Sequence, residues 1–408
     1  MNIDLLKVKS LSEAVEICKQ SLDSLDLKKV KSLKIEDSLG YRLAEDILAK
    51  EDLPAFRKST MDGFAVASKS TLGASDSIPT ILEFQETIDI GYAPKMKINA
   101  NQASKIFTGG MLAQGSDSVV PIEYAEFVGD NLVAIYRPAS FLENVIDIGD
   151  DCKKGDLYFR KGQLIEPKFI GAFASLGYSH VKVYDKLKVR IISTGDEILP
   201  PDADIPLAKT RDINSYSISA LCKEAGLEIL DKRHVFDLRE QIMKELMADD
   251  VDILIISGSS SKGDKDFVPS IIAENFTPGL LIHGIALKPG KPTSFSSDGK
   301  KLVLGLPGHP VSAYTVFKVF FEEGLKDFYG SDKGFSFPAS LTRNVASSPG
   351  RTKIQFVNLE KKEDGLIAQP VFAASGNISL LKNSDAYFII DQDEEGKEKG
   401  ETVWCKLI

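Results

Sequence analysis

Helical and strand-like patterns of apolar residues alternate along the chain. Ser10 and Glu13 have the spacing of a capping box, and apolar residues follow at helical intervals as far as Leu22, which predicts an opening helix. A second helical pattern covers residues 164–177 (LIEPKFIGAFASLG). From about residue 35 to 140, short apolar stretches are separated by Gly, Pro, Asn and Asp, which is typical of β-rich structure. We expect the two helices to pack together, with the β-rich block inserted between them.

From residue 187 to 329, strand-like runs alternate with helical ones. The expected strands are LKVRIIST, LEILDKRHV, VDILIISG, IHGIALKPG and KLVLGLPG, and the expected helices lie near 214–225 and 238–248, from Phe267 onward and at 311–325. This alternation predicts a parallel sheet with helices on both faces. Beyond it, short β segments ending in ETVWCKLI predict a separate β domain. The expected divisions are 1–34 with 141–186, 35–140, 187–329 and 330–408.

Composition narrows the class of protein. The chain has 408 residues and a formal net charge of −9, which argues against binding to nucleic acid or to an anionic membrane. Its four cysteines form no C-x-x-C pair and fit a reducing compartment. The N-terminal residues lack the apolar segment of a signal peptide, and no apolar run approaches the roughly 18 residues of a membrane span. We therefore expect a cytoplasmic protein.

Three loops follow expected strands: Ser193–Glu197 (STGDE), 257–266 (SGSSSKGDKD) and 305–310 (GLPGHP). Ligands bind at the carboxyl ends of the strands in an open parallel sheet, and Gly and Ser allow backbone N–H groups to approach an anion. One such loop alone is ordinary in an α/β domain, so the argument depends on the three converging. The candidate substrate-binding residues are Ser193, Thr194, Gly195, Glu197, Ser257, Gly258, Gly263, Pro307, Gly308 and Pro310.

Other segments carry weaker signals. Lys288 and Lys291, held by prolines in KPGKP, are positioned cations suited to phosphate or to an oxyanion such as molybdate, although a solvated turn has the same composition. Asp62 before Gly63, and Thr108 before two glycines, are by themselves ordinary turn residues. His309 is the one histidine in a candidate loop. No Walker A, dinucleotide, G-x-S-x-G or H-E-x-x-H motif is present, so NTPase, dehydrogenase, serine hydrolase and zinc protease are unsupported.

Taken in order, these motifs resemble the MoeA-type molybdenum insertases, the molybdopterin molybdenumtransferases that include the E domain of gephyrin. The resemblance is carried by residues 53–65, 106–110, 193–197, 288–292 and 305–313, and it extends to Ser375-Gly376. It implies a helical linker domain with an inserted β-rich domain, a three-layer α/β domain like the molybdopterin adenylyltransferases, and a small C-terminal β-barrel. It also implies a homodimer whose active site lies between the α/β domain of one subunit and the β-rich domain of its partner.

The activity that the resemblance implies is insertion of molybdenum from molybdate into adenylylated molybdopterin, with release of AMP and a requirement for Mg²⁺. The acidic residues carried over are Asp62, Asp151, Glu197, Asp237 and Asp266. Asp237 and Asp266 would help to hold Mg²⁺, Lys288 would neutralise phosphate or molybdate, and Asp62 with Thr108 would reach in from the partner subunit; Lys291 and Ser375 would bind substrate. Such chemistry needs charge neutralisation and positioning rather than a protein nucleophile.

The chain departs from the family pattern at three positions, Ser259, Gly284 and His309, where a glycine, a lysine and an asparagine are common. Two other functions stay open: an adenylyltransferase that makes the adenylylated pterin from ATP, and a gephyrin-like scaffold. Tungstate is an alternative to molybdate. Expected protein partners are a molybdopterin adenylyltransferase and apo-molybdoenzymes, with no nucleic acid and no membrane.

Overall fold

The computed structural model describes residues 8–258, 267–331, 334–363 and 365–408. The chain divides into two compact units. One contains the residues up to Glu45, Lys161–Ile170 and His180–Ile408, and the other contains Asp46–Arg160 and Gly171–Ser179. Within the described ranges, every helix is too short or too polar to cross a lipid bilayer.

A six-stranded sheet forms the centre of the first unit, in the order β17-β14-β18-β22-β21-β19. The first four strands are parallel, as predicted: β17 (Glu228–Val235), β14 (Lys188–Thr194), β18 (Ile253–Ser257) and β22 (Leu302–Leu306). Every residue of β18 and β22 is buried, which explains their continuous apolar sequences. β21 (Ser294–Ser297) and β19 (Gly279–His283) complete the sheet in antiparallel orientation.

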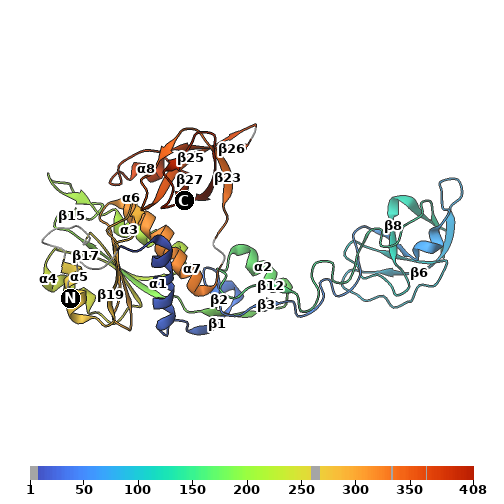
Figure 1. Ribbon diagram of the computed structural model, residues 1–408. Coiled ribbons are helices and arrows are strands. Elements are labelled where there is room, and N and C mark those ends of the chain that lie inside the picture. The colour runs from blue at the N-terminus through green and yellow to red at the C-terminus, as the bar shows by residue number, and fades with distance from the viewer. Residues whose placement is uncertain (1–7, 259–266, 332–333, 364) are drawn as a thin grey trace. The chain divides into compact units, whose positions relative to one another are not determined.

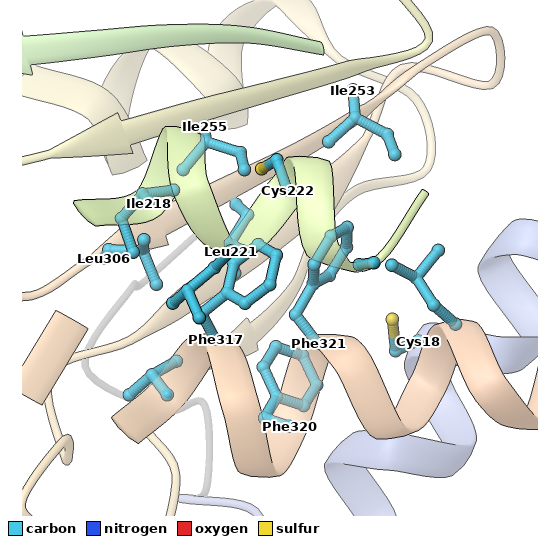
Figure 2. Close-up of a cluster of buried hydrophobic side chains, with 14 of the residues drawn as sticks. Cys18, Ile218, Leu221, Cys222, Ile253, Ile255, Leu306, Phe317, Phe320 and Phe321 are labelled. Atoms are coloured by element: carbon cyan, nitrogen blue, oxygen red, sulfur yellow. The ribbon is translucent and has the colours of Figure 1, made fainter. Parts of the chain in front are cut away.

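Helices cover both faces of this sheet and make a three-layer α/β/α domain (Figure 1). One hydrophobic cluster contains the buried residues of α4 (Arg239–Leu246) and α5 (Phe267–Asn275). The cluster on the other face contains those of α3 (Asn214–Glu224), α6 (Pro310–Val316), the π-helical segment η5 (Phe317–Phe321) and α7 (Glu322–Tyr329). Figure 2 shows Ile218 and Leu221 of α3 close to the phenylalanines of η5. The helix expected at 311–325 is thus a continuous helical run with a π turn, ended by Gly330 in the left-handed conformation (φ 68°).

The opening helix α1 (Leu11–Ser24) has the predicted capping box, because the Ser10 and Glu13 side chains each accept from the other's backbone N–H. We expected it to pack with the helix at 164–177, which is α2 (Pro167–Ser175). Within the first unit, the buried Cys18 and Leu22 of α1 share a hydrophobic cluster with α7. Gly324 of α7 lies directly opposite Cys18, and its missing side chain allows the close approach.

The segments expected as a helical linker also contain strands. A three-stranded sheet in the first unit joins β1 (Val30–Lys34), β13 (His180–Tyr184) and β2 (Arg42–Leu43). Two shorter strand pairs occur elsewhere in this unit, β15 (Ile198–Leu199) with β16 (Thr210–Arg211) and β24 (Val345–Ala346) with β28 (Gly396–Lys397).

The C-terminal strands close into a small barrel in the order β25-β26-β23-β29-β27, with β27 pairing back to β25. Their bounds are β23 (Phe337–Leu341), β25 (Thr352–Lys362), β26 (Gly365–Pro370), β27 (Ala386–Ile390) and β29 (Thr402–Leu407), with a short helix α8 (Ser379–Lys382) before β27. A separate cluster of buried side chains, including Val357, Phe388 and Cys405, fills the barrel. The predicted small β domain is therefore confirmed as a closed barrel.

One expected strand was wrong. The run IHGIALKPG is not continuous, because β19 ends at His283 and Gly284 turns the chain with φ 98°. Leu287–Lys288 then forms the short strand β20, which pairs in parallel with β25 of the barrel rather than with the α/β sheet.

The second unit is β-rich, as predicted. Its six-stranded sheet has the order β8-β5-β7-β6-β10-β9, with bounds Ser118–Pro121, Gly63–Val66, Gln102–Ile106, Thr80–Ile88, Leu132–Ile135 and Ala125–Val128. Two further pairs are β4 (Lys58–Ser59) with β11 (Val145–Ile146) and β3 (Ile47–Leu48) with β12 (Leu157–Phe159). Short 3₁₀ turns occupy Ser68–Thr71 and Ile122–Tyr124 here, and Ile35–Asp37 in the first unit.

The contact between α1 and α7 leads to a stability prediction. A Cβ at Gly324 would lie 2.6 Å from the Sγ atom of Cys18, so Gly324→Ala should destabilise the protein by about 1–3 kcal/mol through overpacking. Gly171→Ala is the matched control, since Gly171 is also helical and has nothing within 4 Å of the added carbon. Chemical denaturation measures both. Equal stability of the Gly324→Ala protein and the wild type would contradict the packing described.

Candidate anion-binding and active site

The sheet order places three of the expected loops next to one another. Thr194, Ser257 and Leu306 end the neighbouring strands β14, β18 and β22. The hydroxyl of Thr194 donates to the carbonyl of Ser257 over 3.4 Å, and the N–H of Gly258 donates to the carbonyl of Leu306 over 3.4 Å. Hydrogen bonds therefore join these loops at the carboxyl edge of the sheet, where α/β folds bind ligands.

Glycine is required where the loops meet. Gly258 has φ 109°, and a Cβ there would lie 2.4 Å from the carbonyl oxygen of Thr194. Gly195 has φ 145°, and its Cβ would lie 2.7 Å from a carboxylate oxygen of Glu197. A Cβ on Gly308 would make only an ordinary contact, 3.6 Å from the Cα of Gly258. At Gly258 a side chain would collide with the backbone of Thr194, whereas at Gly195 the positive φ is what favours glycine, because the Glu197 side chain could move away.

A polar network that sequence reasoning missed supports these loops. Asp212 accepts hydrogen bonds from the hydroxyls of Ser193 (2.8 Å) and Ser215 (2.6 Å). Asn214, at the start of α3, donates to the carbonyl of Gly308 over 2.8 Å. We used residues 214–225 only as a helical pattern. The signal that was available is the group of polar residues Asp212, Asn214 and Ser215 around the start of that helix.

The structure describes some of the acidic residues that we expected in the site, and others lie outside the described residues. The N–H of Asp237 donates to the Asp196 carboxylate over 3.3 Å, which brings two carboxylate residues together, and Glu197 is exposed one residue further along the first loop. Asp266 and Gly263, like Ser259, lie outside the described residues. In the part of the chain that the structure describes, no three His, Cys, Asp or Glu residues gather in a way that would hold a metal. The contact places Asp237 and Asp196 next to each other, and carboxylate oxygens are the ligand type that Mg²⁺ prefers.

A cavity of about 730 Å³ lies between the α/β domain and the barrel. The KPGKP segment and the Pro307–His309 loop line it from one side, and the start of β25 and residues 371–375 line it from the other. The pairing of β20 with β25 builds this cavity, because it sets Leu287 opposite Thr352 and Lys288 opposite Lys353. Candidate residues from two domains are thereby brought into one pocket.

The pocket is strongly cationic. Lys288, Lys291, Arg351 and Lys353 line it, and among its described lining residues there is no Asp or Glu. Like charges on opposite residues of paired strands repel each other. Burial and the neighbouring charge of Lys288 hold the pKa of Lys353 below its ordinary value. A bound oxyanion relieves this repulsion, so the arrangement is suited to anion binding. Arg351 and Lys353 were missed because the start of a β-strand gives no loop motif.

The proline loop reaches the barrel at the same pocket. Pro307 is buried, Pro310 begins α6, and the N–H of Val311 donates to the carbonyl of Ser375 over 3.1 Å. His309 Nδ1 lies 2.8 Å from the hydroxyl oxygen of Ser375. Ser375 therefore contacts the candidate loop directly, although the two lie in separate domains.

Gly284, a departure from the family pattern, has a structural explanation. Its carbonyl accepts from the N–H of Lys9 over 3.1 Å, and a Cβ would lie 3.3 Å from a methyl group of Val8. With φ 98° as well, a lysine at this position would be strained. The N-terminal segment that passes here accounts for the glycine.

Asp62 and Thr108 lie together in the β-rich unit. One carboxylate oxygen of Asp62 accepts from both the N–H (2.7 Å) and the hydroxyl (2.8 Å) of Thr108, and these hydrogen bonds hold the pKa of Asp62 below its ordinary value. Both residues are exposed. Asp151, in the same unit, donates its N–H to the carbonyl of Leu53. Asp62 is thus a fixed, ionised acceptor at the surface.

Family models cover almost the whole chain. Residues 9–177 match the MoeA N-terminal region (domain I and II), residues 190–327 match a "Probable molybdopterin binding domain", and residues 338–407 match the MoeA C-terminal region (domain IV). The fold and the site thus define a protein of the molybdopterin-binding class.

Relatives agree with these matches along the full length. A protein of Methanocaldococcus jannaschii that is named for molybdopterin biosynthesis is 36% identical over 99% of this chain and 98% of its own. The molybdopterin molybdenumtransferase of Bacillus subtilis is 31% identical over 92% of this chain and 89% of its own. The crystal structure of a molybdopterin biosynthesis MoeA protein from Pyrococcus horikosii aligns with a TM-score of 0.77 and 32% identity, covering 98% of this chain and 99% of that one. The chain belongs to the MoeA family.

The cationic pocket leads to a binding prediction. Lys353→Gln removes one of its four positive charges and should weaken molybdate binding roughly tenfold, the effect of losing one charge-assisted hydrogen bond. Lys361→Gln is the control, because Lys361 lies exposed near the other end of the same strand, opposite Leu366. Isothermal titration calorimetry at low salt measures both. Equal molybdate affinity of the two variants would exclude Lys353 from the anion site.

Proposed function

We propose that this protein is an enzyme of molybdenum cofactor biosynthesis that inserts molybdenum from molybdate into adenylylated molybdopterin and releases AMP. The observation that carries the proposal is the pocket lined by Lys288, Lys291, Arg351 and Lys353, without a carboxylate among its described lining residues. Its closeness to the strand-end loops supports the proposal, since Gly258 and Gly308 belong to both. Membership of the MoeA family, with relatives named molybdopterin molybdenumtransferase, supports it further.

In this proposal, the pocket cations bind molybdate and lie beside the phosphoanhydride, and the strand-end loops bind the pterin. Cleavage of a phosphoanhydride needs neutralisation of the charge that develops on the departing phosphate, and Lys288 and Lys291 supply it. Backbone N–H groups of the exposed turn at Gly308 and His309 would contribute to phosphate binding. Ser193, Thr194 and Ser257 are buried at the strand ends, so they shape the loops around the substrate.

Mg²⁺ is the metal that we assign to the acidic edge of this site. Asp237 would hold it together with Asp266 and substrate phosphate, and Asp196 is close enough to Asp237 to support the site. When bound, Mg²⁺ would neutralise charge on the phosphoanhydride. Tungstate has the same charge as molybdate and a similar size, and it fits the same cationic lining.

We further propose that the active unit is a cytoplasmic homodimer in which Asp62 and Thr108 act on the substrate held by the partner subunit. The fixed acceptor geometry of Asp62 supports a catalytic part for this pair. Transfer partners would be a molybdopterin adenylyltransferase upstream and apo-molybdoenzymes downstream. The proposed chain has four domains: 1–34 joined to 141–186, 35–140, 187–329 and 330–408.

Two other functions are less well supported. A stand-alone adenylyltransferase would not need the barrel, yet the barrel supplies Arg351 and Lys353 to the pocket. A scaffold does not need a cluster of cations in one pocket, and the repulsion between these cations destabilises the protein.

The proposal predicts AMP release by the purified protein from adenylylated molybdopterin with Mg²⁺, provided that molybdate is present. Lys288→Gln should lower the rate by a factor on the order of 10², the typical effect of removing one group that stabilises developing charge. Lys361→Gln should leave the rate unchanged, since Lys361 lies outside the pocket lining. Chromatography of AMP measures the rate. AMP release from ATP alone would point to the adenylyltransferase, and tight pterin binding without AMP release would point to the scaffold.

A further inference from the structure

Gln355 is a buried polar residue on the barrel side of the cationic pocket. It lies on β25, is only 4% exposed, and is among the residues that line the pocket. The barrel also contributes a group of apolar lining residues: Ile354, Phe356, Val371, Phe372 and Leu380. A buried amide among apolar side chains needs hydrogen-bond partners, so the partners of Gln355 show what its amide can still bind.

The hydrogen bonds of Gln355 fix the direction in which its amide faces. Its Nε2 atom donates to the carbonyl of Phe356 over 3.0 Å and to the carbonyl of Val371 over 2.9 Å. Both partners are carbonyl oxygens, which only accept, so the nitrogen must face them and both amide hydrogens are used. Within the described chain nothing donates to the Oε1 atom, and it is not one of the fully enclosed side-chain atoms that lack a partner. Oε1 is therefore an acceptor that a ligand in the pocket can reach.

The pocket is larger than an oxyanion requires. Its volume of about 730 Å³ is in the range of sites that bury a whole small molecule. A tetrahedral anion of one metal and four oxygens fills only a small part of that space, next to the cations. The apolar lining of the barrel is then left for a flat, weakly polar part of the ligand.

We propose that Gln355 is a specificity-determining residue whose Oε1 atom accepts a hydrogen bond from an exocyclic amino group on a heterocyclic ring of the substrate. This inference rests on the proposed function, since it names the part of the substrate that lies against the barrel. Adenine and pterin each carry such an amino group, and the phosphoanhydride joins them. With the pterin in the strand-end loops, the ring at the barrel is the adenine, and the opposite orientation of the substrate places the pterin there.

Phe372 supplies an aromatic face for the same ring. It lies two residues beyond the end of β26, lines the pocket and is 58% exposed. Its segment is held on both sides, because the N–H of Val371 donates to the carbonyl of Phe356 over 2.9 Å and the carbonyl of Ser375 accepts from Val311 over 3.1 Å. An exposed phenylalanine on a fixed segment is suited to stack on a flat heterocycle. The glutamine amide would then bond to the edge of a ring whose face lies against this phenylalanine.

The first test uses small ligands and the wild-type protein. Isothermal titration calorimetry compares AMP with purine riboside 5′-monophosphate, which lacks the amino group, and a pterin monophosphate with its analogue that lacks the 2-amino group. One of the two ligands should bind roughly three- to tenfold more tightly than its analogue, the usual effect of one hydrogen bond. The pair that shows the difference identifies the ring that lies at the barrel.

The second test assigns the difference to Gln355. Gln355→Met keeps the length of the side chain and removes the amide, so ligand and analogue should bind this variant equally. Gln369→Met is the matched control, since Gln369 is exposed on the neighbouring strand β26 and outside the pocket lining, and it should keep the wild-type difference. Phe372→Ala should weaken the ligand and its analogue alike, each roughly tenfold, because stacking does not involve the amino group. Chemical denaturation checks that each variant is folded.

Equal binding of both ligands and their analogues by the wild type would overturn the inference and leave the proposed function standing. This comparison needs no variant, so it decides the question even if Gln355→Met is unstable. A difference that persists in Gln355→Met would also overturn the inference, because the amino group would then bond elsewhere. Failure of the wild type to bind AMP, the pterin monophosphate and molybdate would contradict the proposed function itself.

Discussion

The backbone pairing of β20 with β25 is the interaction on which the candidate site depends. Two residues of the α/β domain, Leu287 and Lys288, join the barrel sheet and face Thr352 and Lys353. Without this pairing, the KPGKP cations and the barrel cations would belong to separate surfaces. With it, positive side chains stand opposite one another in one pocket. The repulsion between them is a cost that the rest of the fold must offset, and an anion is the ligand that removes it.

A shared hydrophobic core holds the two sides of that pocket together. One continuous cluster of buried side chains includes α1, the α3 face of the sheet, the helical run from Pro310 to Tyr329, and the barrel residues Ile354 and Phe356. Figure 2 shows part of this cluster, where Cys18 of α1 approaches the phenylalanines of η5. Because the barrel is packed into the same core as the α/β domain, the two sides of the pocket are held in register. The charged lining then lies on a rigid support, which an anion site requires.

The sequence predicted the elements whose local pattern is strong. The capping box at Ser10 marked α1, and the apolar runs of β14 and β18 marked the sheet, because strands covered on both faces must be apolar throughout. The loops at Thr194 and Gly258 could be predicted for the same reason, since each follows such a strand. Ser294–Ser297 could not, because this buried strand is made mostly of serines that carry no apolar signal.

The contacts between these helices, strands and loops were harder to predict than the elements themselves. In the sequence, Leu287–Lys288 continues the pattern of a strand of the α/β sheet. In the structure, the left-handed turn at Gly284 changes the chain direction, and these two residues pair with the barrel. Arg351 and Lys353 join the site through that same pairing, and Asn214 joins it through a hydrogen bond to a carbonyl far along the chain. Such contacts depend on tertiary structure, so a one-dimensional pattern does not contain them.

Molybdenum itself offers the most direct test that this pocket is the oxyanion site. Crystals of the protein soaked in molybdate, measured at the molybdenum absorption edge, would locate the metal by its anomalous scattering. Our account predicts a peak between the KPGKP segment and the start of β25, within hydrogen-bonding reach of Lys288 and Arg351. A well-occupied peak elsewhere, with this pocket empty, would contradict it.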